Sequence, residues 1–274
     1  MDDAGVIKEV FGVDRALIGV VHLEPLPGTP RSTATVEAVI AQAVAEARLY
    51  AEAGYHGLII ENMGDRPYLG REVGPEVVAT MTATGRAVVA AVDLAVGVQV
   101  LAGANQEALA VAQAIGGAFA RVEGFVFAHV ADEGVLQSDA AELLRYRRAI
   151  GADNIRVFAD IKKKHSSHAM TADVDLADTA SAAEFFLADG VVVTGTATGS
   201  PTTRADVEAV AARVSIPTLV GSGVNPDNLA DYARADALIV GSYVKVDGLW
   251  SNEIDPRRVD ALARAFAALP NHDR

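Results

Sequence analysis

Short apolar runs alternate with longer amphipathic segments along nearly the whole chain. Eight of these runs, rich in Val, Ile, Leu and Ala, have the length and composition of buried strands. They span Leu17–Leu23, Gly57–Asn62, Val96–Leu101, Phe119–Glu123, Arg156–Ile161, Gly190–Thr194, Thr218–Val220 and Ala237–Val240. Such runs predict strands that are covered on both faces.

Segments with apolar residues at helical spacing lie around these runs. They span Val6–Phe11, Thr35–Glu52, Pro75–Ala91, Gln106–Ile115, Asp139–Ile150, Leu176–Ala188, Arg204–Val214, Pro226–Arg234 and Pro256–Leu269. Gly54 stands where one helix ends, Pro75 where another begins, and Asn105 where a third is capped. Residues 124–138 and 162–174 are predicted as loops.

Eight strand–helix alternations, without a linker or a break in composition, favour an α/β fold with a parallel sheet. Eight units predict closure into one (β/α)8 TIM barrel domain over residues 1–274, with a short N-terminal helix across the barrel bottom. An open doubly wound sheet is the alternative. It is weakened because no Gly-x-Gly-x-x-Gly turn follows the first strand.

Composition narrows the possible classes. The 274 residues are 51% hydrophobic, 22% charged and only 5% aromatic, so a large aliphatic core is available. A net charge of −13 disfavours nucleic acid and anionic membranes as partners. The chain has no cysteine, which excludes disulfides, Cys-based zinc sites and cysteine nucleophiles. No signal peptide and no membrane-spanning run of about 18 apolar residues is recognised, so a cytoplasmic protein is predicted.

The stretch Pro217–Gly248 contains a candidate phosphate site. Its two strands end in Gly221-Ser222-Gly223 and Gly241-Ser242. Glycine and serine at a strand end leave backbone N–H groups accessible, and the loops after strands seven and eight are where barrels bind phosphate. We therefore expect these five residues to hold one phosphate group.

Polar residues stand at nearly every other strand end, where barrel active sites are built. The candidates for catalysis are His22, Glu61, Glu123, Asp160, Lys162 and His165. The candidates for further ligand contacts are Gln99, Arg121 and Thr194. Burying such a ring without a purpose is costly. The alternative is a layer of ion pairs that satisfies itself, such as Arg121 with Glu123 or Asp160 with Lys162.

The segment Asp160–His165 (DIKKKH) is the most reactive in composition. A lysine close to other cations loses its proton more easily, which suits proton abstraction beside a carbonyl or formation of a Schiff base. Lys163 is interpreted as a solvated loop residue. Lys164 and His165 stay open between a functional role and hydrogen bonding within the loop.

Two further possibilities concern ligands. His22, Glu61, Glu123 and Asp160 could converge on a divalent metal, although no cofactor is predicted. The Gly/Thr-rich loop at residues 194–201 could close over a ligand or be a simple connector. It lacks the Gly-Lys-[Ser/Thr] ending of a nucleotide-binding P-loop.

Motifs spread over nearly the whole chain resemble those of the photosystem I biogenesis protein (BtpA) family. They are Gly19–Leu23 with Pro25–Gly28, Glu61-Asn62, Gly97–Leu101, Phe119–Glu123, Asp132–Gly134, Ala159–Lys162, Lys164-His165, Thr194-Gly195, Thr198-Gly199, Gly221–Val224 and Gly241-Ser242. The resemblance implies a ribulose-phosphate-binding barrel with a phosphate site. It carries over no settled reaction. The family's name comes from a role in photosystem I accumulation in cyanobacteria, and many relatives occur without photosynthesis.

Two functions are compatible with these features. The first is an enzyme that isomerises, epimerises or cleaves a small phosphorylated metabolite such as a sugar phosphate. The second is a non-catalytic assembly or stability factor on a barrel scaffold. A homo-oligomer is expected in either case, because the Ala-rich helices Val36–Ala53 and Val77–Ala91 offer small-residue packing faces.

Overall fold

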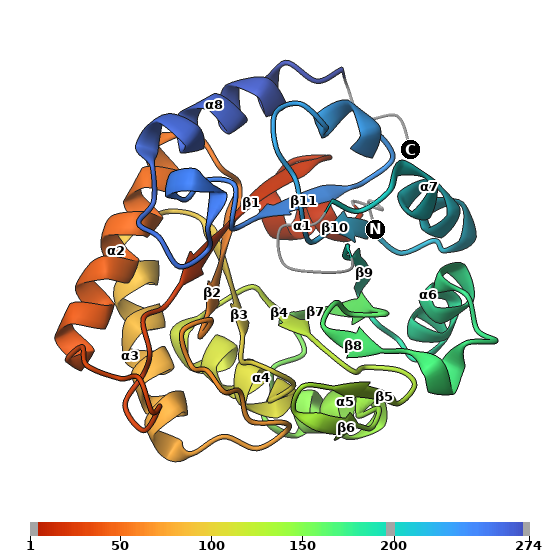
Figure 1. The fold of residues 1–274 in the computed structure, drawn as a ribbon, viewed down its shortest axis with the longest axis horizontal. Coiled ribbons are helices and arrows are strands. Elements are labelled where there is room, and N and C mark those ends of the chain that lie inside the picture. Colours follow the sequence, from red (N-terminus) through yellow and green to blue (C-terminus); the bar gives the residue numbers. More distant parts are fainter. Residues whose placement is uncertain (1–4, 196–200, 271–274) are drawn as a thin grey trace.

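The computed structural model describes residues 5–195 and 201–270, which form a closed parallel barrel (Figure 1). Its strands are β1 (Ala16–His22), β2 (Gly57–Glu61), β3 (Ala95–Gln99), β4 (Phe119–Val122), β7 (Arg156–Ile161), β9 (Gly190–Val193), β10 (Thr218–Val220) and β11 (Ala237–Val240). They pair in this order, and β11 returns to β1. The predicted (β/α)8 barrel is confirmed, with each strand within one or two residues of its expected bounds.

Helices surround the strands as a ring in Figure 1. They are α2 (Val36–Glu52), α3 (Pro75–Ala91), α4 (Asn105–Ile115), α5 (Ala140–Ala149), α6 (Leu176–Phe185), α7 (Arg204–Arg213) and α8 (Pro256–Ala267). Side-chain caps begin several of them. Thr35, Thr203 and Asp255 each accept a hydrogen bond from a backbone N–H in the first turn.

One expected helix is wrong. Instead of a helix over Pro226–Arg234, the connection from β10 to β11 contains only the 3-10 turn η2 (Leu229–Tyr232). The side chains of Asn225 and Asn228 accept hydrogen bonds from backbone N–H groups of this loop, at 2.9 and 2.8 Å. Such bonds offer the backbone an alternative to a helix.

The short helix α1 (Val6–Phe11) covers one end of the barrel interior, as predicted. The Phe11 ring packs against the rings of Phe119 and Phe158, with centroids 5.4 and 6.5 Å apart. Side chains alternate between the two faces of a strand. On β1, Ile18 therefore packs with this interior cluster, whereas Leu17 packs toward the helices.

Two predicted loops contain additional structure. β5 (His129–Ala131), β6 (Gly134–Leu136) and β8 (Ser166–Ser167) form a three-stranded antiparallel sheet in the connections after β4 and β7. The 3-10 turns η1 (Ala169–Thr171) and η3 (Val246–Gly248) follow β8 and β11. Because these connections leave the carboxyl ends of β4 and β7, the small sheet lies beside the barrel mouth.

Candidate active site

Strand alternation brings polar side chains together at the carboxyl end of the barrel. His22 on β1 is in register with Glu61 on β2, and Glu61 is in register with Gln99 on β3. Arg121 on β4 and Asp160 on β7 continue this inner layer above Phe119 and Phe158. Glu61, Gln99, Arg121 and Asp160 are all buried. The predicted polar ring is therefore largely assembled.

Arg121 and Asp160 form a buried bidentate ion pair. Arg121 Nε donates to Asp160 Oδ1 at 2.8 Å, and Nη2 donates to Oδ2 at 2.9 Å. Both side chains are at most 5% exposed. The pairing of Asp160 with Lys162, considered from the sequence, is not observed. Both carboxylate oxygens of Asp160 are thus engaged by Arg121.

Lys163 and Glu123 form a second buried ion pair, 2.7 Å long. The interpretation of Lys163 as solvated is wrong, since its side chain is only 6% exposed. Burial acts to lower the pKa of Lys163, but the charges of Glu123 and Glu133 outweigh this, and the pKa is raised. Gln99 Nε2 also donates to Glu123 at 3.2 Å. Burial raises the pKa of Glu123, while the charge of Lys163 opposes this rise, and the ion pair holds the Glu123 side chain within the wall of the site.

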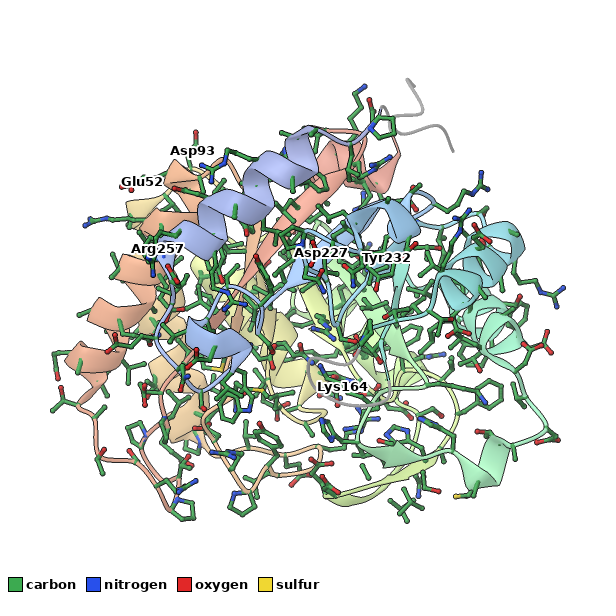
Figure 2. The ribbon with its side chains drawn as sticks, turned by 45° about the horizontal axis from the view of Figure 1, so that its top comes forward. Glu52, Asp93, Lys164, Asp227, Tyr232 and Arg257 are labelled. Carbon is green, nitrogen blue, oxygen red and sulfur yellow. The ribbon has the colours of Figure 1, made fainter. Side chains whose placement is uncertain are left out.

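Lys162 does not reach the centre of the site. β7 ends at Ile161, and Lys162 has a φ of 44°, which breaks the strand alternation. Its ammonium group donates instead to Thr171 O at 3.3 Å. Lys164, two residues further along the chain, lies centrally among the side chains that the helices enclose (Figure 2).

Two cavities meet at the barrel mouth. The first, of about 210 Å³, is the predicted phosphate cradle, and its lining includes Gly221, Ser222, Gly223, Gly241, Ser242 and His22. The second, of about 230 Å³, includes Gln99, Glu123, Glu133, His165 and Trp250. Glu61, Met63, Arg121 and Lys164 line both cavities. A ligand that fills the two would therefore pass these four side chains.

Glycine at two strand ends leaves the cradle open. A Cβ on Gly241 would lie 2.9 Å from His22 Nε2, and a Cβ on Gly221 would lie 3.0 Å from Arg121 Nη2. The Gly221 N–H donates to Val193 O at 2.8 Å, so it belongs to the sheet. Gly221 thus supplies space rather than an amide. Ser222 Oγ accepts a hydrogen bond from the Gly195 N–H at 2.6 Å, which joins the ends of β9 and β10.

Glu61 and Lys164 are opposite charges without a fixed partner. Among residues 5–195 and 201–270, neither side chain forms an ion pair. Burial raises the pKa of Glu61, while the charges of Arg121 and Lys164 oppose this rise. Burial and the charge of Arg121 lower the pKa of Lys164. The pKa of Glu61 is therefore displaced upward and that of Lys164 downward, which is typical of groups that exchange protons in an active site.

His22 is neutral in this environment. Burial and the nearby Lys245 charge lower its pKa to about 3. Its Nδ1 lies 3.4 Å from the Trp250 carbonyl oxygen, and its ring meets the Trp250 ring edge-on at 6.2 Å. With the Nδ1 proton toward that carbonyl, Nε2 carries a lone pair at the cradle. His22 can therefore accept a hydrogen bond there.

The other predicted residues are placed less centrally. His165 is exposed and lines the second cavity. Thr194 lies beside Gly221, with its Cγ2 3.2 Å from the position of a Gly221 Cβ. Most of the sixth loop, residues 196–200, lies outside the described residues. In the part that the structure describes, no three His, Asp or Glu side chains are grouped to hold a metal. Arg121 and Lys163 engage two of the four ligands considered, Asp160 and Glu123.

Supporting contacts that the sequence pattern did not reveal hold the loops in place. Asn62 donates to Asp65 at 2.9 Å, and Asp65 accepts from the Leu26 N–H at 2.7 Å. Asn62 Oδ1 accepts from the Leu101 N–H at 2.7 Å. These bonds tie together the connections after β1, β2 and β3. Asn62, the last residue of a predicted strand, therefore has a structural role.

The fold and site define a (β/α)8 barrel with a polar, charged mouth and glycine-lined strand ends. The chain belongs to the BtpA family, which it matches over residues 13–268. It is 42% identical to an uncharacterized mitochondrial protein of Caenorhabditis elegans over 94% of this chain and 96% of that one. It is 37% identical to the photosystem I biogenesis protein BtpA of Synechocystis over 94% of this chain and 90% of that one.

Solved structures with little sequence identity share the fold. Tryptophan synthase from Mycobacterium tuberculosis aligns with a TM-score of 0.61 and 20% identity, over 97% of this chain and 98% of that one. N-(5'-phosphoribosyl)anthranilate isomerase from Pyrococcus furiosus aligns with a TM-score of 0.58 and 12% identity, over 93% and 100%. At these identities the likeness establishes the barrel alone.

Proposed function

We propose that this chain is an enzyme that acts beside a carbonyl group of a small phosphorylated metabolite, such as a sugar phosphate. The observation that carries the proposal is the pair of adjoining cavities that share Glu61, Arg121 and Lys164. The phosphate would occupy the cradle at the ends of β10 and β11. The reacting carbon atoms would extend into the second cavity.

Charge at the mouth supports an anionic ligand despite the overall charge of −13. Arg121 and Lys164 place two cationic side chains along the cradle, of which Arg121 is buried and Lys164 is half-buried. Cations interact with an anion more strongly where water is excluded. Two solved structures that share the fold have names that refer to phosphorylated compounds, thiamine phosphate pyrophosphorylase and N-(5'-phosphoribosyl)anthranilate isomerase. These names are consistent with a phosphorylated ligand.

Glu61 is the proposed acid–base group. Asp160 is engaged by Arg121 and Glu123 by Lys163, so Glu61 is the carboxylate that lines both cavities without an ion pair in the described chain. A raised pKa suits a carboxylate that removes a proton from carbon and returns it. Isomerisation and epimerisation begin with removal of a proton from carbon, and carbon–carbon cleavage of the retro-aldol type ends with return of a proton to carbon.

Ligand binding and proton exchange test the proposal separately. Inorganic phosphate and pentose or hexose phosphates should raise the melting temperature, whereas the matching unphosphorylated sugars should not. With a true substrate in D2O, NMR should show exchange of the proton beside the carbonyl. Glu61→Gln should slow this exchange by about 10²-fold or more and leave phosphate binding intact. Absence of any phosphate-dependent shift would contradict the proposal.

A non-catalytic assembly factor is the second candidate, favoured by the name of the Synechocystis relative. Glu61→Gln also separates the two functions, because a scaffold should keep its cellular role when one acid–base group is lost. Asp160→Asn is less suitable, since it leaves the buried Arg121 charge unpaired.

Oligomeric state and location stay predictions. No helix in residues 5–195 and 201–270 combines the length and apolar character needed to cross a bilayer. The worm relative's name places it in mitochondria, so the cytoplasmic expectation needs a localisation experiment on this chain. Size-exclusion chromatography with light scattering tests the expected homo-oligomer.

A further inference from the structure

Lys164, which is half-buried, differs from the two buried lysines of the barrel, Lys163 and Lys245. Lys163 binds Glu123 at 2.7 Å, and Lys245 binds Glu46 at 2.7 Å. Within the described residues, Lys164 forms no such ion pair, although it lines both cavities at the mouth. A cation withdrawn from water without a carboxylate partner has an electrostatic cost that its neighbours avoid. A function at the cavity junction accounts for that cost.

The backbone fixes where Lys164 points. It lies between Lys162 and His165, whose φ angles of 44° and 55° are both in the left-handed region that L-residues rarely adopt. Lys163 on its other side is anchored to Glu123. The segment is thus held at both flanks, and of its three lysines Lys164 alone lines both cavities, beside Glu61 and Arg121.

We propose that Lys164 is an imine-forming residue, whose amine attacks the carbonyl carbon of an aldehyde or ketone that carries a phosphate group. This proposal rests on the proposed function and specifies its chemistry. The phosphate in the cradle would bring the carbonyl to the junction of the two cavities. Burial and the charge of Arg121 lower the pKa of Lys164, which increases its neutral, nucleophilic form.

The step balances with groups that line the junction. The neutral Lys164 amine forms a carbon–nitrogen bond to the carbonyl carbon, and the nitrogen passes a proton to the former carbonyl oxygen. The protonated carboxyl of Glu61 then donates a proton to this hydroxyl, which leaves as water as the carbon–oxygen bond breaks. The product is a protonated imine beside the Glu61 carboxylate. That carboxylate can then remove a proton from the adjacent carbon, whose electron pair is accepted by the iminium.

Reductive trapping of the unmodified full-length chain tests the proposal. Formaldehyde with cyanoborohydride at neutral pH probes the amine without a substrate. Peptide mapping by mass spectrometry should show Lys164 methylated first, ahead of the exposed Lys8 and the ion-paired Lys163. Excess inorganic phosphate should slow this modification by about tenfold or more at saturation, without affecting Lys8. Equal rates for Lys164 and Lys8 would overturn the proposal.

The second arm uses dihydroxyacetone phosphate and pentose phosphates with borohydride. Any of these compounds that raises the melting temperature should leave a reduced adduct on Lys164. Lys164→Arg, which keeps the charge but removes the amine, should abolish the adduct. A carbonyl compound that stabilises the protein but leaves no adduct on Lys164 would overturn the imine while leaving the proposed function intact. If no phosphate compound stabilises the protein, the proposed function itself fails.

Discussion

Arg121 and Asp160 join two neighbouring barrel strands through two parallel hydrogen bonds of 2.8 and 2.9 Å, with both side chains buried. Arg121 also lines both cavities, so the ion pair fixes the position of the guanidinium that faces the cradle. Its contribution is therefore both structural and electrostatic, and the two can be separated by substitution.

Breaking this pair should destabilise the fold strongly. Asp160→Asn removes the charge but keeps the shape, which leaves Arg121 buried without a carboxylate. We expect a loss of about 3–5 kcal/mol in the free energy of unfolding, measured with urea. The double variant Arg121→Met/Asp160→Leu replaces both charges by apolar groups and should recover much of the stability. It should not recover phosphate binding. An unchanged stability of Asp160→Asn would contradict the buried ion pair.

Lys162 and Lys163 form a matched pair of adjacent lysines with opposite environments. Lys163→Met leaves the Glu123 carboxylate buried without its partner and should cost about 3–5 kcal/mol of unfolding free energy. Lys162→Met removes one hydrogen bond of 3.3 Å to Thr171 O and should cost only about 0.5–1.5 kcal/mol. Urea unfolding of the two variants checks this difference. Similar losses for both would contradict the structure.

This contrast shows where sequence reasoning succeeds and where it stops. The strands and their alternation follow from apolar runs, so His22, Glu61, Gln99, Arg121 and Asp160 could be placed on one inner layer in advance. Alternation ends with the strand at Ile161, where the positive φ of Lys162 redirects the chain. The hydrophobic pattern therefore could not predict that Lys164, rather than Lys162, lies at the centre of the site.

Ion-pair partners were also beyond the sequence. Arg121 on β4 stands two residues before Glu123, which follows the end of that strand. Their side chains engage groups from β7 and its following loop, Asp160 and Lys163. These partners depend on the register between β4 and β7, in which Arg121 lies opposite Phe158. The spacing of residues within one segment of the sequence does not predict the register between two strands.

The neutral His22 should make stability depend on pH in a defined direction. Its pKa falls from 6.5 to about 3 on folding, so below pH 6.5 the unfolded chain binds a proton that the folded chain does not. This lowers stability as pH decreases from about 6.5 toward 3, and the full contribution is present above 6.5. The urea midpoint should therefore decrease more between pH 7 and pH 4 for the natural chain than for His22→Gln. A parallel decrease in both proteins would contradict a buried neutral His22.

Adding one methyl group to the cradle should weaken phosphate binding without altering the fold. In Gly241→Ala the new Cβ would lie 2.9 Å from His22 Nε2 and Cε1, so it intrudes on the wall where the phosphate is proposed to bind. We expect the dissociation constant for inorganic phosphate to rise at least about tenfold, or about 1.4 kcal/mol, by isothermal titration calorimetry. Gly5→Ala is the matched control, because a Cβ at Gly5 has nothing within 4 Å. If Gly241→Ala binds phosphate as the natural chain does, the anion does not occupy the ends of β10 and β11.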